Sequence, residues 1–450
     1  MIIKIKSHDK KTFLLLIAYL IVLNIVIPSI DPNKWGEHYL IGFDSNYSIA
    51  KHLLGVFFSL VIAHSTSKLL VNGTISNYMM FCINCLYFIP GVVFLSLTRN
   101  ETGYLLIYAS FWIILTFMNG ILPKSSNTLS LLISEKFKKK FFSIFVLLIS
   151  FTAILISGIL SDFRFVLNIF DISNVYKLRF AFREENTHWI LLAYITFAAK
   201  IIPILVVISI ELKKKYIYIV LLAISQIFLF SIGANRLFLF DLLLIIMVYY
   251  FGKKNHKILV YLLLAVYLLI YVENYINITQ YGLELIRRIS ITPNLISQFY
   301  FDFFKVNPPD FLKQHLDWLT HYFNLYESNY TTPIPRIIGS IYSSNIGENM
   351  NTGLVGGGFA NYGMYSLILS PLGFILSFRL LDSILYKLKE NNIKLAISVV
   401  ITTYLINSNQ FFSLLFKPSE VLMLFLSLMF LQMEFNGSND EIINEKKINF

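Results

Sequence analysis

Long apolar segments alternate with shorter polar ones along almost the whole chain. Segments of roughly 17 to 22 residues with few charges recur, each long enough to cross a hydrocarbon core of about 30 Å as a helix. We count about twelve of them, the first from Thr12 to Ile30. The pattern predicts an all-α polytopic membrane protein.

Two connections between the apolar segments are much longer than the others. Residues 276–360 form a large polar loop near the carboxyl-terminal end, and residues 161–188 form a smaller one. No internal repeat or Pro/Gly linker divides the sequence, so we expect residues 1–450 to form a single integral membrane domain. Because the spans must satisfy the bilayer, the large loop is expected to carry the specificity.

Composition agrees with a membrane protein and excludes several other classes. With 56% hydrophobic and 14% charged residues and a mean hydropathy of +0.66, the chain is too apolar for a water-soluble protein of this length. The net charge of +11 comes from lysines scattered beside predicted helix ends. Since they form no single basic face, a nucleic-acid partner is not expected. We expect Cys82 and Cys85 to be small buried hydrophobes.

Lysine placement predicts the orientation of the chain in the membrane. Lysines precede the first apolar segment, which lacks a small-residue cleavage site and therefore reads as a retained anchor. By the positive-inside rule the amino terminus is cytoplasmic. The lysine clusters at 136–140, 213–215, 253–254 and 387–389 then also fall on the cytoplasmic side, and both long loops face outward. The polar tail, 434–450, is expected to be cytoplasmic and disordered.

Within the large loop, Asn307-Pro308-Pro309-Asp310 is a plausible helix start, because proline is tolerated in the first helical turn. Apolar residues then recur at spacings of mostly three and four up to Tyr326. Such a helix would either lie on the membrane surface or pack against the ends of the spans, and the sequence leaves both possibilities open.

The arginines are distributed very unevenly between the two sides. Of nine, only Arg379 is predicted to be cytoplasmic; the outward ones are Arg99, Arg164, Arg179, Arg183, Arg236, Arg287, Arg288 and Arg336. Guanidinium stays charged and matches phosphate oxygens with a planar fork, whereas lysine is a hydrated point charge. An outward phosphate or pyrophosphate ligand would explain the segregation; pairing with lipid headgroups or nearby carboxylates is the alternative.

The large loop ends on a distinctive pattern of asparagine, threonine and glycine. Its members are Asn349, Asn351, Thr352, Gly353, Gly356, Gly358 and, at the start of the next span, Gly363. This N-x-N-T-G-x-x-G-x-G pattern resembles the end of the large external loop in the O-antigen and oligosaccharide repeat-unit polymerases called the Wzy family. Arg287-Arg288 with Pro293, and the small-residue turn that ends in Arg236, also resemble segments of that family. The glycines have a structural alternative, since glycine permits unusual turns and close packing.

The resemblance implies a function at the outer face of a bacterial inner membrane. It implies an enzyme that transfers a growing glycan from undecaprenyl pyrophosphate onto a new lipid-linked repeat unit at the periplasmic face. The substrate would be an undecaprenyl-pyrophosphate-linked oligosaccharide among membrane lipids, and a chain-length regulator protein is an expected partner. Neither a cofactor nor a metal is implied.

This chemistry suggests roles for particular residues. Fixed cations would stabilise the leaving pyrophosphate, for which we name Arg236, Arg287 and Arg288. A base must take the proton of the attacking hydroxyl. Glu284 and His321 are named for that role from a set that also contains His315, Asp317, Glu327 and Glu348. Substrate binding is assigned to Arg179, Arg183, Arg336, Trp318, Tyr322, Asn349, Asn351, Thr352, Gly353, Gly356 and Gly358.

Two other functions fit the same sequence features. An O-antigen ligase would also use outward arginines and a large loop, and differs mainly in its acceptor. A flippase for the same lipid-linked sugar belongs to a different class, in which polar groups at mid-membrane depth and repeated halves are typical. Lys200 and Asp241 are the main ionisable residues inside predicted spans, and no repeat is visible. These features favour an enzyme over a transporter.

Overall fold

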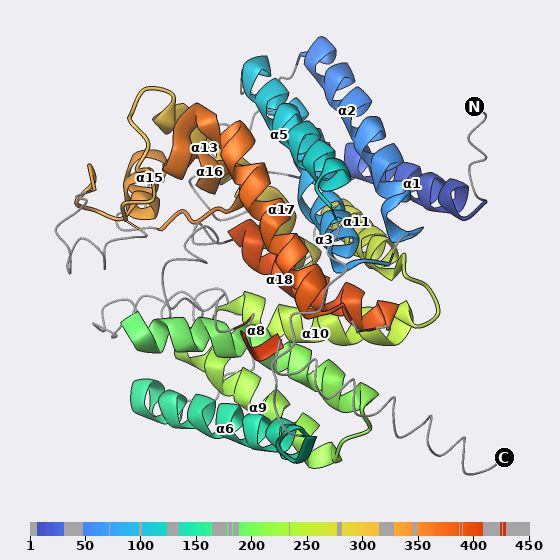
Figure 1. Ribbon diagram of the computed structural model, residues 1–450. Helices are drawn as coiled ribbons and strands as arrows, with labels where there is room; N and C mark the ends of the chain where they lie inside the picture. The colour runs from blue at the N-terminus through green and yellow to red at the C-terminus, as the bar shows by residue number, and fades with distance from the viewer. Residues whose placement is uncertain are drawn as a thin grey trace. The chain divides into compact units, whose positions relative to one another are not determined.

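Figure 1 shows the computed structural model of the chain. The structure describes residues 7–30, 48–71, 73–98, 101–123, 135–163, 178, 182, 189–233, 235–276, 281–314, 328–343, 349–386, 388, 390–407, 424 and 426–428. Every regular element in these residues is a helix. The all-α prediction is therefore confirmed for this part of the chain.

The described residues contain the following α-helices. They are α1 (Ser7–Ser29), α2 (Ile49–Ser67), α3 (Ile75–Ile83), α4 (Ile89–Leu97), α5 (Thr102–Ile121), α6 (Glu135–Ser161), α8 (Trp189–Glu211), α9 (Tyr216–Gly233), α10 (Arg236–Gly252), α11 (Ile258–Ile276), α12 (Tyr281–Ile286), α13 (Thr292–Phe304), α15 (Ile334–Tyr342), α16 (Leu354–Tyr362), α17 (Ser366–Ile384) and α18 (Asn391–Asn407). Two π-helical turns, η3 (Asn84–Phe88) and η4 (Arg287–Ile291), and the 3₁₀ turns η2 (Leu69–Val71) and η5 (Gly363–Tyr365) complete the set.

Nine stretches among the described residues are long and apolar enough to cross a membrane. They are Lys10–Ser29, Ile49–Ser67, Ile75–Leu97, Thr102–Ile121, Phe142–Ser161, Ile190–Glu211, Tyr216–Gly233, Ile258–Ile276 and Leu354–Ile384. These helices indicate a multi-pass membrane protein. The total of about twelve spans and the outward orientation of the long loops stay predictions, and the tail 434–450 lies outside the described residues.

The chain divides into two compact units, and each is described by itself. The first consists of Met1–Pro123, Lys257–Phe378 and Thr402–Lys417; the second consists of Lys124–His256, Arg379–Ile401 and Pro418–Phe450. Candidate spans occur in both units. The single membrane domain inferred from the sequence stays a prediction.

The first unit is built around a helix that other helices surround. From Ile75 to Leu97, through α3, η3 and α4, every residue is buried, whereas the neighbouring spans α1, α2, α5 and α11 each expose one side. Cys82 and Cys85 lie in this helix, buried and without a disulfide, as expected. A helix that is apolar all round and buried all round is the core of the unit.

The π turn in this central helix changes its hydrogen bonding. Wider π spacing frees backbone carbonyls, and a carbonyl buried away from water needs another donor. Side chains supply the donors: Tyr19 bonds to Cys85 O at 3.1 Å and Ser290 bonds to Leu86 O at 2.7 Å. Tyr87 O accepts from the Tyr108 hydroxyl at 3.2 Å and from the Asn294 amide at 3.3 Å. The turn therefore joins α1, α5, η4 and α13.

In the second unit, α8, α9 and α10 share a buried polar cluster. Lys200 on α8 and Asp241 on α10 form an ion pair whose side chains are 5% and 0% exposed. The Gln226 amide on α9 donates to Ala199 O at 3.0 Å and to Phe238 O at 2.7 Å. The sequence identified Lys200 and Asp241 as intramembrane charges, and their pairing makes such burial tolerable.

The predicted helix start at Asn307–Asp310 is wrong. Residues 311–314 form a turn, with φ of 52° at Phe311 and 64° at Leu312, values that an α-helix excludes. Asp310 is buried and directs the turn, because its carboxylate accepts from the Gln314 N–H at 2.7 Å and from the Ser328 hydroxyl at 2.6 Å. The rest of that predicted helix, 315–326, lies outside the described residues.

We expect Asn294→Ala to lower the free energy of unfolding by about 2 kcal/mol, because it removes three buried hydrogen bonds. Unfolding of the full chain in mixed micelles would measure the change. Asn407→Ala is the control, since among the described residues that amide bonds only to Thr403 O in its own helix. Equal effects of the two variants would contradict the role given to the π-turn network.

Candidate functional site

The residues singled out from the sequence are distributed over several parts of the structure. The first unit holds Arg287, Arg288, Arg336, Asn349, Asn351, Thr352, Gly353, Gly356 and Gly358. Arg236 belongs to the second unit, and of Glu284 only the backbone, in α12, is described. Arg179, Arg183, Trp318, His321 and Tyr322 lie outside the described residues. The candidate site is therefore built from the first unit.

A hydrogen bond between the end of α11 and the start of α12 helps to position the arginine pair. The Glu273 carboxylate at the end of α11 accepts from the N–H of Gly282, with distances of 3.1 and 2.9 Å to its two oxygens. This contact fixes the start of α12, which leads directly into η4. Glu273 is 5% exposed, so this hydrogen bond lies inside the first unit. The sequence analysis missed this residue, although a lone carboxylate at the end of an apolar span was a visible signal.

The two arginines differ in exposure. Arg287 is 4% exposed, whereas Arg288 is half-buried at the surface of the unit. Two residues later, Ser290 is held on the carbonyl of Leu86, so the π turn that carries both arginines is attached to the central helix. π turns inside helices occur frequently at functional sites. Of the pair, Arg288 is the one better placed to reach a ligand.

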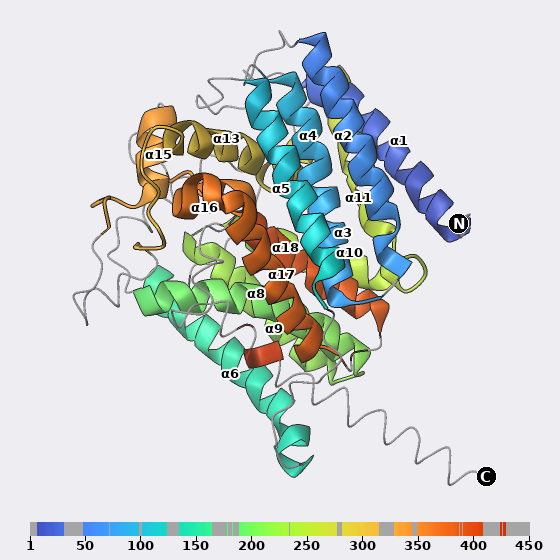
Figure 2. The ribbon, with the colours of Figure 1, turned by 45° about the horizontal axis from the view of Figure 1, so that its top comes forward.

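The asparagine and glycine motif packs directly on the helix that follows the arginines. The Thr352 hydroxyl donates to Pro293 O at 3.0 Å, in the first turn of α13. At Gly356, an added Cβ would lie 2.9 Å from the Cα of Ser297. Figures 1 and 2 show α13 and α16 side by side, with α15 close to both. Two segments about 60 residues apart in sequence thus pack against each other.

The start of the motif presents its asparagines to the outside. Met350 is 2% exposed; its N–H donates to Pro335 O at 2.9 Å, and its carbonyl accepts from the Tyr300 hydroxyl at 2.9 Å. Asn351 is exposed and Asn349 is half-buried. The backbone is therefore fixed at Met350 while the two flanking amides remain accessible to a ligand.

The remainder of the motif has a packing role. Thr352, Gly353, Gly356 and Gly358 are all buried. The N–H of Gly353 donates to Ile406 O at 2.8 Å, and an added Cβ at Gly358 would lie 2.6 Å from the Ser370 hydroxyl. We therefore retain Asn349 and Asn351 as the candidates for substrate contact and assign the other four to helix packing.

The carboxyl-terminal end of α16 is closed by the Asn307–Asp310 segment. The N–H groups of Asp310 and Phe311 donate to Ala360 O and Asn361 O at 2.8 and 2.9 Å. Gly363, the last glycine of the motif, has a φ of 55° and lies against Pro309. Its ψ of −135° puts this positive-φ conformation outside the left-handed helical region, and glycine, having no Cβ, adopts it without strain.

Arg336 is exposed on α15, whose apolar residues Ile334 and Ile338 are buried. Pro335, the residue before it, holds Met350 through its carbonyl. Arg336 therefore lies one residue from the contact that fixes the two asparagines.

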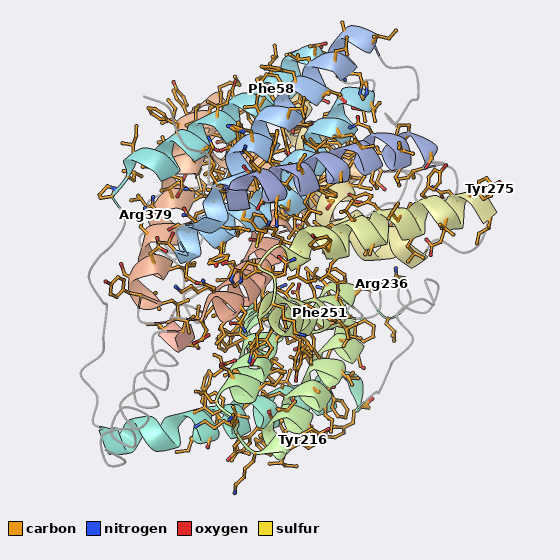
Figure 3. All side chains as sticks on the ribbon, turned by 90° about the vertical axis from the view of Figure 1, so that its right-hand side faces the viewer. Phe58, Tyr216, Arg236, Phe251, Tyr275 and Arg379 are labelled. Atoms are coloured by element: carbon orange, nitrogen blue, oxygen red, sulfur yellow. The ribbon has the colours of Figure 1, made fainter. Side chains whose placement is uncertain are left out.

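In the second unit, Arg236 is the first residue of α10, with Phe251 near the opposite end of that helix (Figure 3). Asn235 caps the helix, because its side-chain oxygen accepts from the Leu237 N–H at 3.2 Å. Phe182, from the smaller loop, packs against the preceding turn, within 3.1 Å of the Cβ position at Gly233. The cap therefore fixes the start of α10, and Phe182 packs on the end of α9.

The sequence analysis also missed a carboxylate on α13. Asp302 is exposed, yet its pKa is raised from an ordinary 3.8 to about 6. The main cause is that the carboxyl group loses part of its hydration, and the second is the nearby Glu101 charge, while Lys305 lowers the pKa. The signal in the sequence was the spacing of Gln298 and Asp302 in α13 and Lys305 at its C-cap, which puts three polar residues on one side of the helix.

We expect Gly356→Ala to destabilise the chain by about 1 to 3 kcal/mol, because the new methyl group would meet the backbone of Ser297. Thermal unfolding in detergent measures the effect. Gly103→Ala is the matched control in α5, where nothing lies within 4 Å of the Cβ position. A destabilised Gly103→Ala, or an unaffected Gly356→Ala, would contradict the packing role.

The raised pKa of Asp302 predicts a pH dependence of stability. A carboxyl group that holds its proton more tightly in the folded state contributes stability at low pH, and loses it as pH rises from about 4 through about 6. Asp302→Asn should therefore be stabilised relative to the wild type more at pH 7.5 than at pH 4. Glu101→Gln should reduce this difference and Lys305→Gln should increase it. A difference independent of pH would refute the assignment.

The described residues of the first unit thus combine an accessible guanidinium, two accessible amides and a fixed helical frame. They contain no group of three or more His, Cys, Asp and Glu side chains that could hold a metal ion. No protein-family model, curated protein or solved structure matches the chain.

Proposed function

We propose that the chain is a surface-polysaccharide polymerase, a metal-independent glycosyltransferase of the O-antigen polymerase type. The observation that carries the proposal is the contact between two segments that resemble that family. The Asn349–Gly358 motif packs on the helix that follows Arg287-Arg288, through the Thr352 hydroxyl on Pro293 O and the close approach of Gly356 to Ser297. Neither segment was predicted to contact the other.

In the proposed reaction, a sugar hydroxyl at the non-reducing end of a lipid-linked repeat unit attacks the anomeric carbon of the growing glycan. The bond between that carbon and the pyrophosphate oxygen breaks, undecaprenyl pyrophosphate leaves, and the hydroxyl proton passes to a base. The leaving pyrophosphate gains negative charge, so guanidinium groups held at that position lower the barrier. Arg288 is the first candidate in the first unit, and Arg236 is the candidate in the second.

Other residues have supporting roles in this proposal. The amides of Asn349 and Asn351 would bind sugar hydroxyls, and Arg336 would bind an anionic group of the substrate. Glu284 and His321 remain the proposed bases. The site would face the periplasm from a bacterial inner membrane, where a chain-length regulator protein is the proposed partner.

One observation supports a second candidate function. Lys200 and the Gln226 amide lie in candidate spans of the second unit, and Lys200 pairs with the buried Asp241 on the neighbouring α10. Intramembrane charges of this kind mark substrate or ion pathways in transporters. A flippase for lipid-linked oligosaccharide is therefore the second candidate, and an O-antigen ligase is the alternative within the enzyme class.

A gel of surface polysaccharide separates these functions. In a strain that lacks the gene, we expect a single repeat unit on the core in place of a ladder, and the wild-type gene should restore the ladder. Arg288→Ala and Arg236→Ala should each reduce polymer at least about 100-fold with normal amounts of protein in the membrane. The corresponding lysine variants should recover little, because lysine lacks the planar fork.

Other outcomes identify the alternatives. Loss of every repeat from the core would overturn the polymerase proposal in favour of a flippase or a ligase. Lipid-linked repeat units trapped on the cytoplasmic side would then indicate a flippase, and lipid-linked polymer accumulated on the periplasmic side would indicate a ligase. Full activity of both alanine variants would refute the pyrophosphate role of the arginines.

A further inference from the structure

One side of α13 carries polar residues that the proposed reaction does not use. Gln298, Asp302 and Lys305 follow one another at spacings of four and three, so they share a side of the helix. Asp302 and Lys305 are exposed and Gln298 is half-buried, whereas most of the helix is buried. This polar side lies on the same helix that packs against the glycine motif.

Aromatic residues flank this polar side. Tyr342, at the end of α15, stacks on Phe299 with ring centroids 4.5 Å apart and an angle of 4° between the ring planes. Loss of hydration and the Asp302 charge both raise the pKa of Tyr342, so the carboxylate and the tyrosine are neighbours. Phe299 covers one face of the Tyr342 ring, and the residue is half-buried.

The polar groups on this side have unused hydrogen-bonding capacity. Lys305 pairs with Glu101 at 3.2 Å and not with Asp302. Among the described residues, neither the Asp302 side chain nor the Gln298 side chain makes a hydrogen bond or an ion pair. A carboxylate that has lost part of its hydration shell gains from ligand hydroxyl donors.

The position of Asp302 along the helix excludes it as the base of the proposed reaction. Asp302 lies ten positions beyond Thr292, the first residue of α13, which at the α-helical rise of about 1.5 Å per residue corresponds to about 15 Å, and Arg288 precedes α13 in the π turn η4. A base must lie within hydrogen-bond reach of the attacking hydroxyl, beside the pyrophosphate. The same distance suits sugars farther along an oligosaccharide whose pyrophosphate end lies at Arg288.

We propose that Gln298, Asp302 and Tyr342 form a glycan subsite, which binds sugars of the lipid-linked oligosaccharide away from the pyrophosphate. The inference rests on the proposed function for the identity of the oligosaccharide. Carboxylate and amide groups pair with sugar hydroxyls, and the ring of Tyr342 packs against the apolar face of a sugar. Lys305, paired with Glu101, borders the subsite.

Binding of lipid-free glycan tests the subsite separately from catalysis. The probe is a set of oligosaccharides made by partial acid hydrolysis of the surface polysaccharide of the same cells, freed of lipid and phosphate. Calorimetry with the purified full chain in detergent measures the dissociation constant. We expect Asp302→Ala, Gln298→Ala and Tyr342→Ala each to weaken binding roughly tenfold or more. Tyr365→Ala is the matched control, because Tyr365 is a 72% exposed tyrosine outside the subsite.

Arg288→Ala separates the subsite from the reaction centre. This variant should bind the lipid-free glycan as the wild type does while making no polymer, whereas the subsite variants should make shortened chains. Thermal unfolding checks that each variant is folded, and Asp302→Asn, which keeps the shape of the side chain, replaces Asp302→Ala if that variant is not.

The outcomes distinguish the two proposals. Unchanged glycan affinity in all three subsite variants would overturn the subsite and leave the polymerase proposal standing. A wild-type chain that binds no glycan would overturn the subsite whatever the polysaccharide gel shows. Glycan binding that depends on these residues, with an unaltered ladder in the strain lacking the gene, would support the subsite and refute the polymerase.

Discussion

The first unit depends on the need to satisfy three buried backbone carbonyls. The carbonyls of Cys85, Leu86 and Tyr87, in the π turn at Asn84–Phe88, all accept hydrogen bonds from side chains of other helices. In a hydrocarbon environment no water can replace such donors. The helices that supply them are therefore held in one arrangement, and the arginine-bearing turn is among them because it supplies Ser290.

Apolar segment length was sufficient to predict the class of protein. The all-helical fold and the repeated candidate spans follow from the bilayer constraint, which acts on every residue of a span and so leaves a strong signal. The two π turns were not predicted, although a proline without an N–H group follows each at the same spacing, Pro90 after the first and Pro293 after the second. The sequence pattern also misassigned Asn307–Asp310, where Asp310 binds side-chain and backbone donors at Ser328 and Gln314 and so favours a turn over a helix.

The candidate site shows a similar division between local and tertiary information. The N-x-N-T-G-x-x-G-x-G pattern and the Arg287-Arg288 pair were visible as residues, but their contact through Pro293 and Ser297 depends on helix packing. The structure also separates the motif into two accessible asparagines and a buried small-residue part. Asp302 was missed because its significance lies in neighbours that are remote in sequence, Glu101 and Tyr342.

The same carbonyl network has a consequence for the order in which the chain assembles. Leu86 is synthesised 204 residues before its donor Ser290, and Tyr87, which Tyr108 can bond first, is synthesised 207 residues before its second donor Asn294. The intervening segment Lys124–His256, which belongs to the second unit, is synthesised in that interval. The last core contacts of the central helix therefore form late, when the segment with the arginine pair and Asn294 has been made. A nascent chain that stops before this segment cannot form the native first unit, so maturation of the core and of the candidate site is a single event.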